Sequence, residues 1–175
     1  MEAMTCNPGP DRRNDVDRLD EPPLAILPEN GVYTIIISLR TDTEVHVGSL
    51  GIIKMEKGFY AYTGSGLGRR ALSLRGRVLR HLKRDKRLKW HIDYLTSNDM
   101  ARIIGVVASE AEKSFECKVA SHLNEVTRYI KRFGCSDCKC VSHLAILPCL
   151  SEDECLSYVE SVYKKLGLTP RSLRL

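Results

Sequence analysis

Four short segments rich in apolar and β-branched residues follow one another in the first half of the chain. They are Val32–Leu39, Thr43–Val47, Ile52–Met55 and Phe59–Tyr62. A polar turn at Thr41 and Asp42 separates the first two segments, which predicts that they form a hairpin. Glycines separate the later segments, so the pattern as a whole predicts an antiparallel meander.

The apolar spacing changes to four after glycines at positions 64, 66 and 68. Leu74, Val78 and Leu82 then fall on one face of a predicted helix. Gly76 disfavours helix by about 1 kcal/mol relative to Ala, so this helix is expected to be imperfect or to start late. The later elements are predicted as a helix or turn at Leu88–Leu95, a strand at Ala101–Ala108, a helix through Phe115, Val119 and Leu123, and a final strand at His143–Leu147.

The last predicted helix has both of its ends marked in the sequence. Ser151 and Glu154 form a capping box, and an apolar stripe continues from Leu156 to Leu166 before Gly167 ends the helix. The chain has 175 residues, which suits one domain. The expected organisation is a mobile acidic tail over residues 1–30, a domain over 31–148 and a C-terminal helical extension over 149–175.

The overall composition is that of an ordinary globular protein. Hydrophobic residues make up 43% of the chain and charged residues 28%, so a core can form without disulfides or metal. No apolar window approaches the length of a membrane span, and the N-terminus lacks the basic and apolar segments of a secretion signal. We therefore expect no membrane partner and a cytoplasmic location, where most of the seven cysteines would stay reduced or bind metal.

The net charge of +5 is distributed very unevenly. Residues 1–30 carry three arginines against seven carboxylates, whereas residues 69–89 carry ten basic groups against Asp85 alone. A field this concentrated attracts a polyanion, and guanidinium groups bond phosphate oxygens in pairs. Nucleic acid is thus the first candidate partner, although a basic run is often only a solvated helix face. The candidate nucleic-acid-binding residues are Arg69, Arg70, Arg75, Arg80, Lys83, Arg84, Lys86 and Arg87.

Two tripeptides on successive strand segments are followed by a basic helix and a helical carboxylate. They are Gly31-Val32-Tyr33 and Tyr62-Thr63-Gly64, with Arg77 and Glu116 after them. Longer strings are Arg77-Val78-Leu79-Arg80-His81, Lys89-Trp90-His91-Ile92-Asp93-Tyr94-Leu95 and Phe115-Glu116-Cys117. Together these strings resemble the GIY-YIG nuclease superfamily in its Uri-type branch, which is common in archaea.

The resemblance covers residues 31 to about 148 and implies both a fold and a site. The implied fold class is α+β, with a small central antiparallel sheet flanked by helices, to which this chain adds a C-terminal helix. Tyr33, Tyr62 and Arg77 resemble the catalytic tyrosines and arginine, and His91 resembles a further active-site histidine. Glu116 is similar to the residue that binds a single Mg²⁺ or Mn²⁺. The segment before Arg77 is longer than in most members, so Arg75 or Arg80 could be the equivalent arginine.

The residues also fit the implied chemistry on their own terms. Phosphodiester hydrolysis needs an activated water, a cation beside the developing negative charge and help for the leaving oxygen. Glu116 offers a hard ligand for the metal ion, and Arg77 a forked positive charge. A nearby guanidinium or metal-bound water would lower a tyrosine pKa, so Tyr33 or Tyr62 could orient or deprotonate the nucleophile, as could His81 or His91. The expected function is a metal-dependent endonuclease acting on DNA.

Each candidate residue also has a structural interpretation. Strand tyrosines usually pack, Glu116 could pair with an arginine, and His91 and Asp93 could hold two helices together by hydrogen bonds. The rival function is a nucleic-acid-binding module for structured RNA or branched DNA that has kept the fold without the chemistry. The segment Cys135-x-x-Cys138-x-Cys140-x-x-His143 contains four potential zinc ligands, but their close spacing favours a compact loop in which cysteines fill space. If the segment does bind zinc, a third possible function is a zinc-stabilised interaction domain.

Overall fold

The computed structural model describes residues 23–175 and has the expected α+β fold. The strands are β1 (Gly31–Leu39), β2 (Thr43–His46), β3 (Ile52–Met55), β4 (Gly58–Gly66), β5 (Ala101–Ser109), β6 (Arg128–Tyr129), β7 (Leu144–Leu147) and β8 (Arg171–Arg174). The helices are α1 (Leu74–Leu82), α2 (His91–Thr96), α3 (Ser114–Val126) and α4 (Glu152–Lys165), with short 3₁₀ turns η1 (Leu24–Ile26), η2 (Gly48–Leu50) and η3 (Arg70–Leu72). Six strands form one antiparallel sheet in the order β6-β7-β4-β1-β5-β8.

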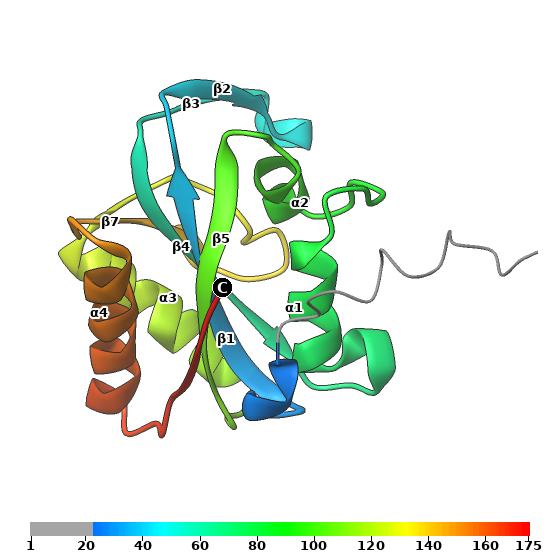
Figure 1. Ribbon diagram of the computed structural model, residues 1–175, viewed down its shortest axis with the longest axis vertical. Helices are drawn as coiled ribbons and strands as arrows, with labels where there is room; N and C mark the ends of the chain where they lie inside the picture. Colours follow the sequence, from blue (N-terminus) through cyan, green and yellow to red (C-terminus); the bar gives the residue numbers. More distant parts are fainter. Residues whose placement is uncertain (1–22) are drawn as a thin grey trace, which may run out of the picture.

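Helices cover both faces of this sheet. Helices α1 and α2 lie on one side, and α3 and α4 lie on the other (Figure 1). Successive residues of β1 point to opposite faces, so Tyr33 and Ile35 join the core under α1 and α2, while Val32 and Ile36 join the core under α3 and α4. Burial on both faces explains why β1 is a continuous apolar run rather than an alternating one.

The predicted hairpin between the first two strand segments is wrong. Strand β2 pairs with β3 in a separate two-stranded sheet, and β1 pairs with β4 on one edge and β5 on the other. Because both edges of β1 are occupied, the segment after Asp42 has no edge of β1 to join. Val45 and Met55 are instead buried against the core from the side of the β2–β3 hairpin, so the simple meander does not form.

Helix α1 begins at Leu74, before Gly76, so of the two expected alternatives the late start is wrong. Ser73 caps the helix, because its hydroxyl oxygen accepts a hydrogen bond from the Gly76 backbone N–H. A Cβ at position 76 would lie 2.1 Å from the carbonyl oxygen of Arg70. The glycine therefore lets the turn η3 pack directly against α1, and this close approach offsets its low helix propensity.

The predicted last helix forms, but a strand that was not predicted follows it. Helix α4 forms as expected, but β8 follows it and pairs with β5, so the segment at 144–147 is not the final strand. At the other end, Leu27 is fully buried in the core beneath α1, which places the start of the fold before Gly31. The remainder of the expected acidic tail, residues 1–22, lies outside the described residues.

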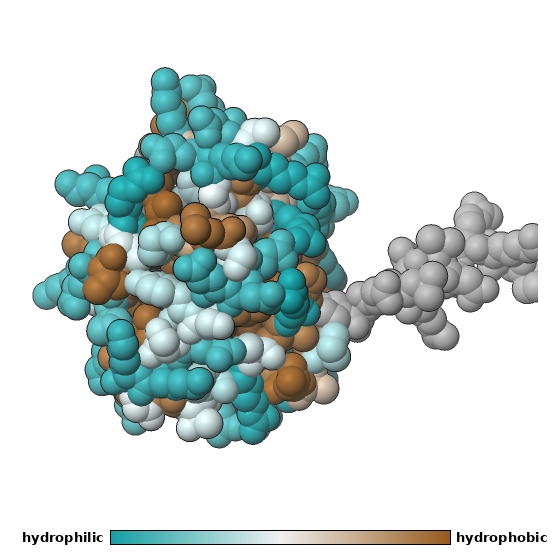
Figure 2. Space-filling model, turned by 60° about the vertical axis from the view of Figure 1, so that its left-hand side comes forward, coloured by the Kyte–Doolittle hydropathy of each residue, from teal (hydrophilic) through white to brown (hydrophobic). Residues whose placement is uncertain are grey.

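The surface on the side of α3 and α4 is mostly polar (Figure 2). Hydrophilic side chains cover most of this face, and apolar side chains gather only in small separate groups (Figure 2). Within residues 23–175, no helix has both the length and the apolar composition that a membrane crossing requires.

Candidate active site

A pocket of about 510 Å³ opens where β4 extends beyond its neighbour β7. Strand β7 pairs with β4 only over Phe59–Tyr62, which leaves the last part of β4 as an open edge. The pocket draws on both layers of helices as well as on the sheet. Its lining includes five of the predicted site residues, namely Tyr33, Tyr62, Arg77, His91 and Glu116.

The sheet register brings the two tyrosines to one face. Tyr33 on β1 lies opposite Gly64 on β4, and Tyr62 lies two residues before Gly64 on that strand. A Cβ at position 64 would lie 2.7 Å from the Tyr33 hydroxyl oxygen, so only glycine leaves room for this phenol. The glycine of the Tyr62-Thr63-Gly64 tripeptide thus has a steric role, because its missing side chain leaves the space that the Tyr33 phenol fills.

The Tyr33 phenol shares a 2.8 Å hydrogen bond with His81 Nε2. His81 is 1% exposed, lies behind the pocket and packs against Tyr62 and Trp90. Burial lowers the His81 pKa to about 3, so the imidazole is neutral at ordinary pH. Of the two expected histidines, His81 therefore supports Tyr33 from behind and does not line the pocket.

Burial decides the protonation of both tyrosines. Desolvation raises the Tyr33 pKa well above 10 and raises the Tyr62 pKa as well, while the nearby Arg77 guanidinium lowers both by less. Arg77 thus lowers both tyrosine pKa values as expected, but desolvation is the larger effect and decides the direction of both shifts. Both side chains enter the pocket as neutral phenols, which suits them to orient a ligand by hydrogen bonding.

Arg77 is the arginine of α1 that faces the pocket. Its guanidinium carbon lies 5.3 Å from the centre of the Trp90 ring, and its buried Nε has no hydrogen-bond partner among residues 23–175. Within the same residues no carboxylate lies at ion-pair distance from it, whereas Arg75 pairs with Glu29 and Arg80 with Asp93. Arg77 is thus the guanidinium held in place with its charge available to a ligand.

His91 and Asp93 have different roles although they are close in sequence. Asp93 is fully buried and accepts hydrogen bonds from Arg80 and from the backbone of Lys89 and Trp90, so it joins α1 to α2 as the structural interpretation held. His91 lines the pocket, and its Nδ1 accepts a 3.0 Å hydrogen bond from Gly134 N–H. Burial lowers the His91 pKa, so the neutral ring carries its proton on Nε2.

Glu116 reaches the open edge of β4 from α3. Its carboxylate accepts a hydrogen bond from the Ser65 hydroxyl and lies 3.2 Å from His143 Nδ1. These two contacts lower the Glu116 pKa against the opposing effect of burial, so the group is ionised. The side chain is 17% exposed and no arginine pairs with it in the described part of the chain, which excludes the predicted arginine salt bridge there.

The donor set around Glu116 fits a hard divalent cation. Mg²⁺ and Mn²⁺ prefer oxygen ligands, and Mg²⁺ commonly uses one or two carboxylates together with waters and substrate phosphate. Glu116 supplies one ionised carboxylate at the wall of the pocket, and the Asp137 side chain also lines this pocket. These residues would hold the ion while leaving most of its coordination positions to water and phosphate.

The predicted nucleic-acid-binding residues divide into two groups. Arg75, Arg80, Arg84 and Lys86 donate hydrogen bonds to backbone carbonyls or buried side chains, so they stabilise the fold around α1. Arg69, Arg70, Lys83 and Arg87 are exposed and have no ion-pair partner in residues 23–175. The basic surface available to a nucleic acid is therefore smaller than the charge count of residues 69–89 suggests.

Sequence reasoning did not assign four residues of the site. Trp90 supports Arg77, Ser65 holds Glu116, and Lys89 and Lys113 bring further positive charge to the pocket wall. Lys89 and Trp90 stand inside one of the strings that carry the family resemblance, and Ser65 directly follows the string Tyr62-Thr63-Gly64. These positions were the available signal. Lys113 has no such signal, because only the packing of α3 against the sheet brings it to the pocket.

The fold and pocket define an α+β domain with a polar site at the edge of its central sheet. The chain belongs to the family DUF123, described as a domain of unknown function, whose model matches residues 32–168. DUF123 is a Uri-like and GIY-YIG-like family, so the expected resemblance is confirmed at this level. No curated protein and no solved structure matches the chain.

Proposed function

We propose that this protein is a divalent-metal-dependent endonuclease that hydrolyses phosphodiester bonds in DNA, with Mg²⁺ or Mn²⁺ as cofactor. The observation that carries the proposal is the meeting of two neutral phenols, one ionised carboxylate and one guanidinium around a single pocket. Among residues 23–175 that guanidinium has no carboxylate partner. The combination of an anion-binding group with a cation-binding group in one pocket is what a metal-assisted phosphoryl site requires.

Arg77 would bind the scissile phosphate. Trp90 holds its guanidinium at the pocket wall, and a forked donor can bond two phosphate oxygens at once. Because the group has no carboxylate to release in residues 23–175, phosphate binding breaks no existing ion pair. Glu116 would hold the divalent ion, whose positive charge would favour ionisation of water and offset charge on the phosphate.

The phenols and His91 would manage hydrogen bonds at the reacting atoms. Tyr33 and Tyr62 remain protonated, so their hydroxyl groups orient the attacking water and a phosphate oxygen. His91 presents an N–H at Nε2, since Nδ1 is occupied by Gly134 N–H. This donor is suited to stabilise the leaving oxygen and does not suit the role of a base that takes a proton through Nε2.

DNA would approach across the basic rim of the pocket. Lys89 and Lys113 lie in its wall, and Arg69 and Arg70 are exposed next to the lining residues Gly68 and Leu72. These cations can contact phosphates on either side of the scissile bond. The proposal places the protein in the nuclease part of the mostly archaeal Uri-type branch and its reaction in the cytoplasm.

The test is plasmid nicking by the purified chain in the presence of Mg²⁺. Glu116→Gln should lower the nicking rate at least a hundredfold, because the neutral amide cannot hold the cation, and should leave DNA affinity within about threefold. The matched control is Glu125→Gln, which changes an exposed carboxylate on the same helix away from the pocket. It should cleave at the rate of the unchanged protein.

Equal cleavage by Glu116→Gln and the unchanged protein would contradict the catalytic assignment. DNA or structured RNA binding without cleavage under any divalent ion would favour the alternative function, a binding module on the same fold. The Ser65 and His143 contacts of Glu116 are the structural feature on which that alternative rests, since they occupy part of the carboxylate.

A further inference from the structure

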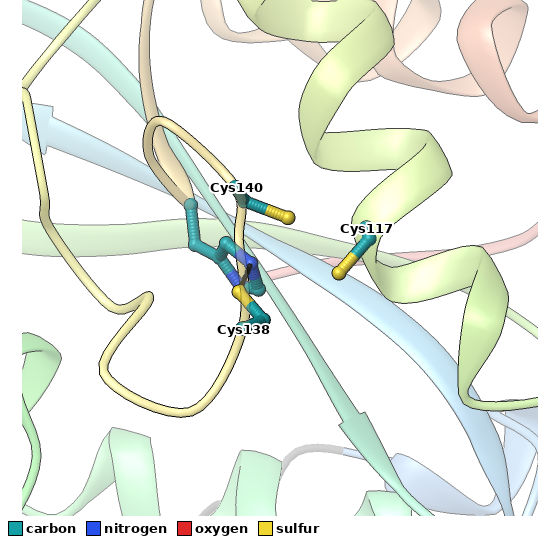
Figure 3. A group of neighbouring side chains, drawn as sticks. Cys117, Cys138 and Cys140 are labelled. Carbon is teal, nitrogen blue, oxygen red and sulfur yellow. Dashed lines mark hydrogen bonds between the residues drawn. The ribbon is translucent and has the colours of Figure 1, made fainter.

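Three cysteines and one histidine gather behind the pocket on the side of α3. They are Cys117, Cys138, Cys140 and His143. One potential ligand atom from each residue lies within 4.8 Å of all the others. Figure 3 shows Cys117 on the helix pointing toward the loop that carries Cys138 and Cys140. The set differs from the four residues grouped by sequence spacing, because Cys117 takes the place of Cys135.

The separation of these atoms fits a tetrahedral ion. With metal–sulfur distances of about 2.3 Å, neighbouring ligand atoms of a tetrahedral zinc site lie about 3.8 Å apart. Cys138 Sγ and His143 Nε2 are already 3.3 Å apart, and none of the six separations exceeds 4.8 Å. Closing on an ion therefore needs shifts of about 1 Å or less, which side-chain torsions can supply.

His143 is oriented as a ligand through Nε2. Its Nδ1 lies 3.2 Å from the Thr63 carbonyl oxygen and 3.2 Å from a Glu116 carboxylate oxygen, so an Nδ1 proton has two acceptors. A proton on Nδ1 leaves the Nε2 lone pair directed at the thiols. Metal-binding histidines commonly donate the other ring N–H to a carbonyl or carboxylate in this way.

The loop that supplies two of the thiols needs such a constraint. Residues 130–143 connect β6 to β7 without a helix or strand, and Phe133 is its large buried anchor. After Phe133, residues 134–141 contribute no buried side chain to the core. Yet this stretch provides Gly134, Ser136 and Asp137 to the pocket wall. Long loops of this kind are usually fixed by a specific interaction where they carry function.

We propose that Cys117, Cys138, Cys140 and His143 bind one zinc ion that ties the 130–143 loop to α3. Four protein ligands close the coordination sphere, so the site is structural and separate from the hard-cation site at Glu116. Three thiolates favour a soft or borderline ion such as Zn²⁺ over Mg²⁺. The proposal does not depend on nuclease activity, because it concerns only the fold of the loop.

The test is metal content of the full chain, purified under reducing conditions after expression with added zinc. Elemental analysis should find about one zinc per chain, and Co²⁺ in its place should give the thiolate charge-transfer bands and intense visible bands of a tetrahedral site. Cys117→Ser and Cys138→Ser should retain less than about a fifth of the zinc. A strong chelator should lower the melting temperature of the unchanged protein and not that of Cys117→Ser.

Cys135→Ser is the matched control, since Cys135 belongs to the same loop and lies outside the cluster. It should keep its full zinc content. A chain that neither carries zinc nor yields the Co²⁺ spectrum, even with reductant present, would overturn the proposal, as would equal zinc loss in Cys135→Ser and Cys117→Ser. Glu116→Gln should keep zinc while losing cleavage, which separates this proposal from the proposed nuclease function.

Discussion

Tyr33, His81 and Gly64 show how single residues of the pocket depend on one another. The absent side chain of Gly64 makes room for the Tyr33 phenol, which in turn bonds the buried His81 ring. Burial is the largest cause of the lowered His81 pKa; the positive charges of Lys86, Arg80 and Arg77 lower it further, and Asp93 alone opposes them. The result is a histidine kept neutral in the native state.

A consequence is a pH dependence of stability that His81 controls. Its pKa is about 3 in the folded protein and about 6.5 when unfolded, so only the unfolded chain takes up a proton between these values. The contribution of neutral His81 to the free energy of unfolding is complete above pH 6.5 and is lost as the pH falls toward 3. From pH 7 to pH 5 the free energy of unfolding should fall by about 2 kcal/mol from this group.

Urea unfolding at pH 7 and pH 5 measures this effect. His81→Gln should lose clearly less stability over that interval than the unchanged protein, because the amide does not titrate. His46→Gln, on the exposed side of β2, is the control and should follow the unchanged protein. The same pH dependence in all three proteins would show that His81 is not the group responsible.

At the scale of elements, the site depends on how α1 and α2 are joined. Asp93 at the start of α2 accepts a 2.6 Å hydrogen bond from Arg80 on α1 and two more from the backbone that leads into α2. Both Arg80 and Arg77 lie against Trp90, the residue directly before α2. The buried carboxylate therefore fixes the surface on which Arg77 rests.

Asp93→Asn should weaken this junction. The neutral amide keeps the shape but loses the charge-assisted bonds, so the free energy of unfolding should fall by about 1–3 kcal/mol. Denaturant titration is the measurement. Asp99→Asn serves as control, because Asp99 is 91% exposed and its pairing with Arg84 should contribute less than about 1 kcal/mol. Comparable losses in the two variants would refute the role given to Asp93.

At the scale of the whole molecule, positive charge is concentrated on the side of the pocket formed by the chain between β4 and α2. In the sequence Arg69 precedes α1 and Lys89 follows it, and Lys89 is part of the pocket wall. Basic groups that contact phosphates release counterions from DNA, so each contact steepens the fall of affinity with salt. The number of phosphate contacts in the proposed DNA interface can thus be obtained from the salt dependence of the affinity.

For duplex DNA, the logarithm of the association constant K falls linearly with the logarithm of the salt concentration. The double variant Arg69→Gln, Lys89→Gln should make this slope less negative by about two. The measurement is fluorescence anisotropy over a range of KCl concentrations. Lys164→Gln with Lys165→Gln removes the same charge from the end of α4, on the other face of the sheet, and should leave the slope unchanged. Identical slopes in both double variants would mean that the charge acts only at long range.

The sequence by itself determined the individual helices and the main strands of the sheet, because hydrophobic periodicity reflects local geometry. It also marked Tyr33, Tyr62, Arg77 and Glu116, since these stand in strings that resemble a known family. Pairing was harder to predict: local pattern does not state which strand edges are free, and so β2 was assigned to β1 and β8 was missed.

Only the tertiary structure decided which groups meet and in what state. Packing between α3 and the loop before β7 brings Cys117 beside Cys138 and Cys140 and leaves Cys135 aside, a choice that spacing along the chain does not contain. Burial raises the pKa of Tyr33 although a guanidinium lies near, because desolvation depends on every atom around the phenol. Contacts between distant residues and exclusion of water are properties of the folded molecule.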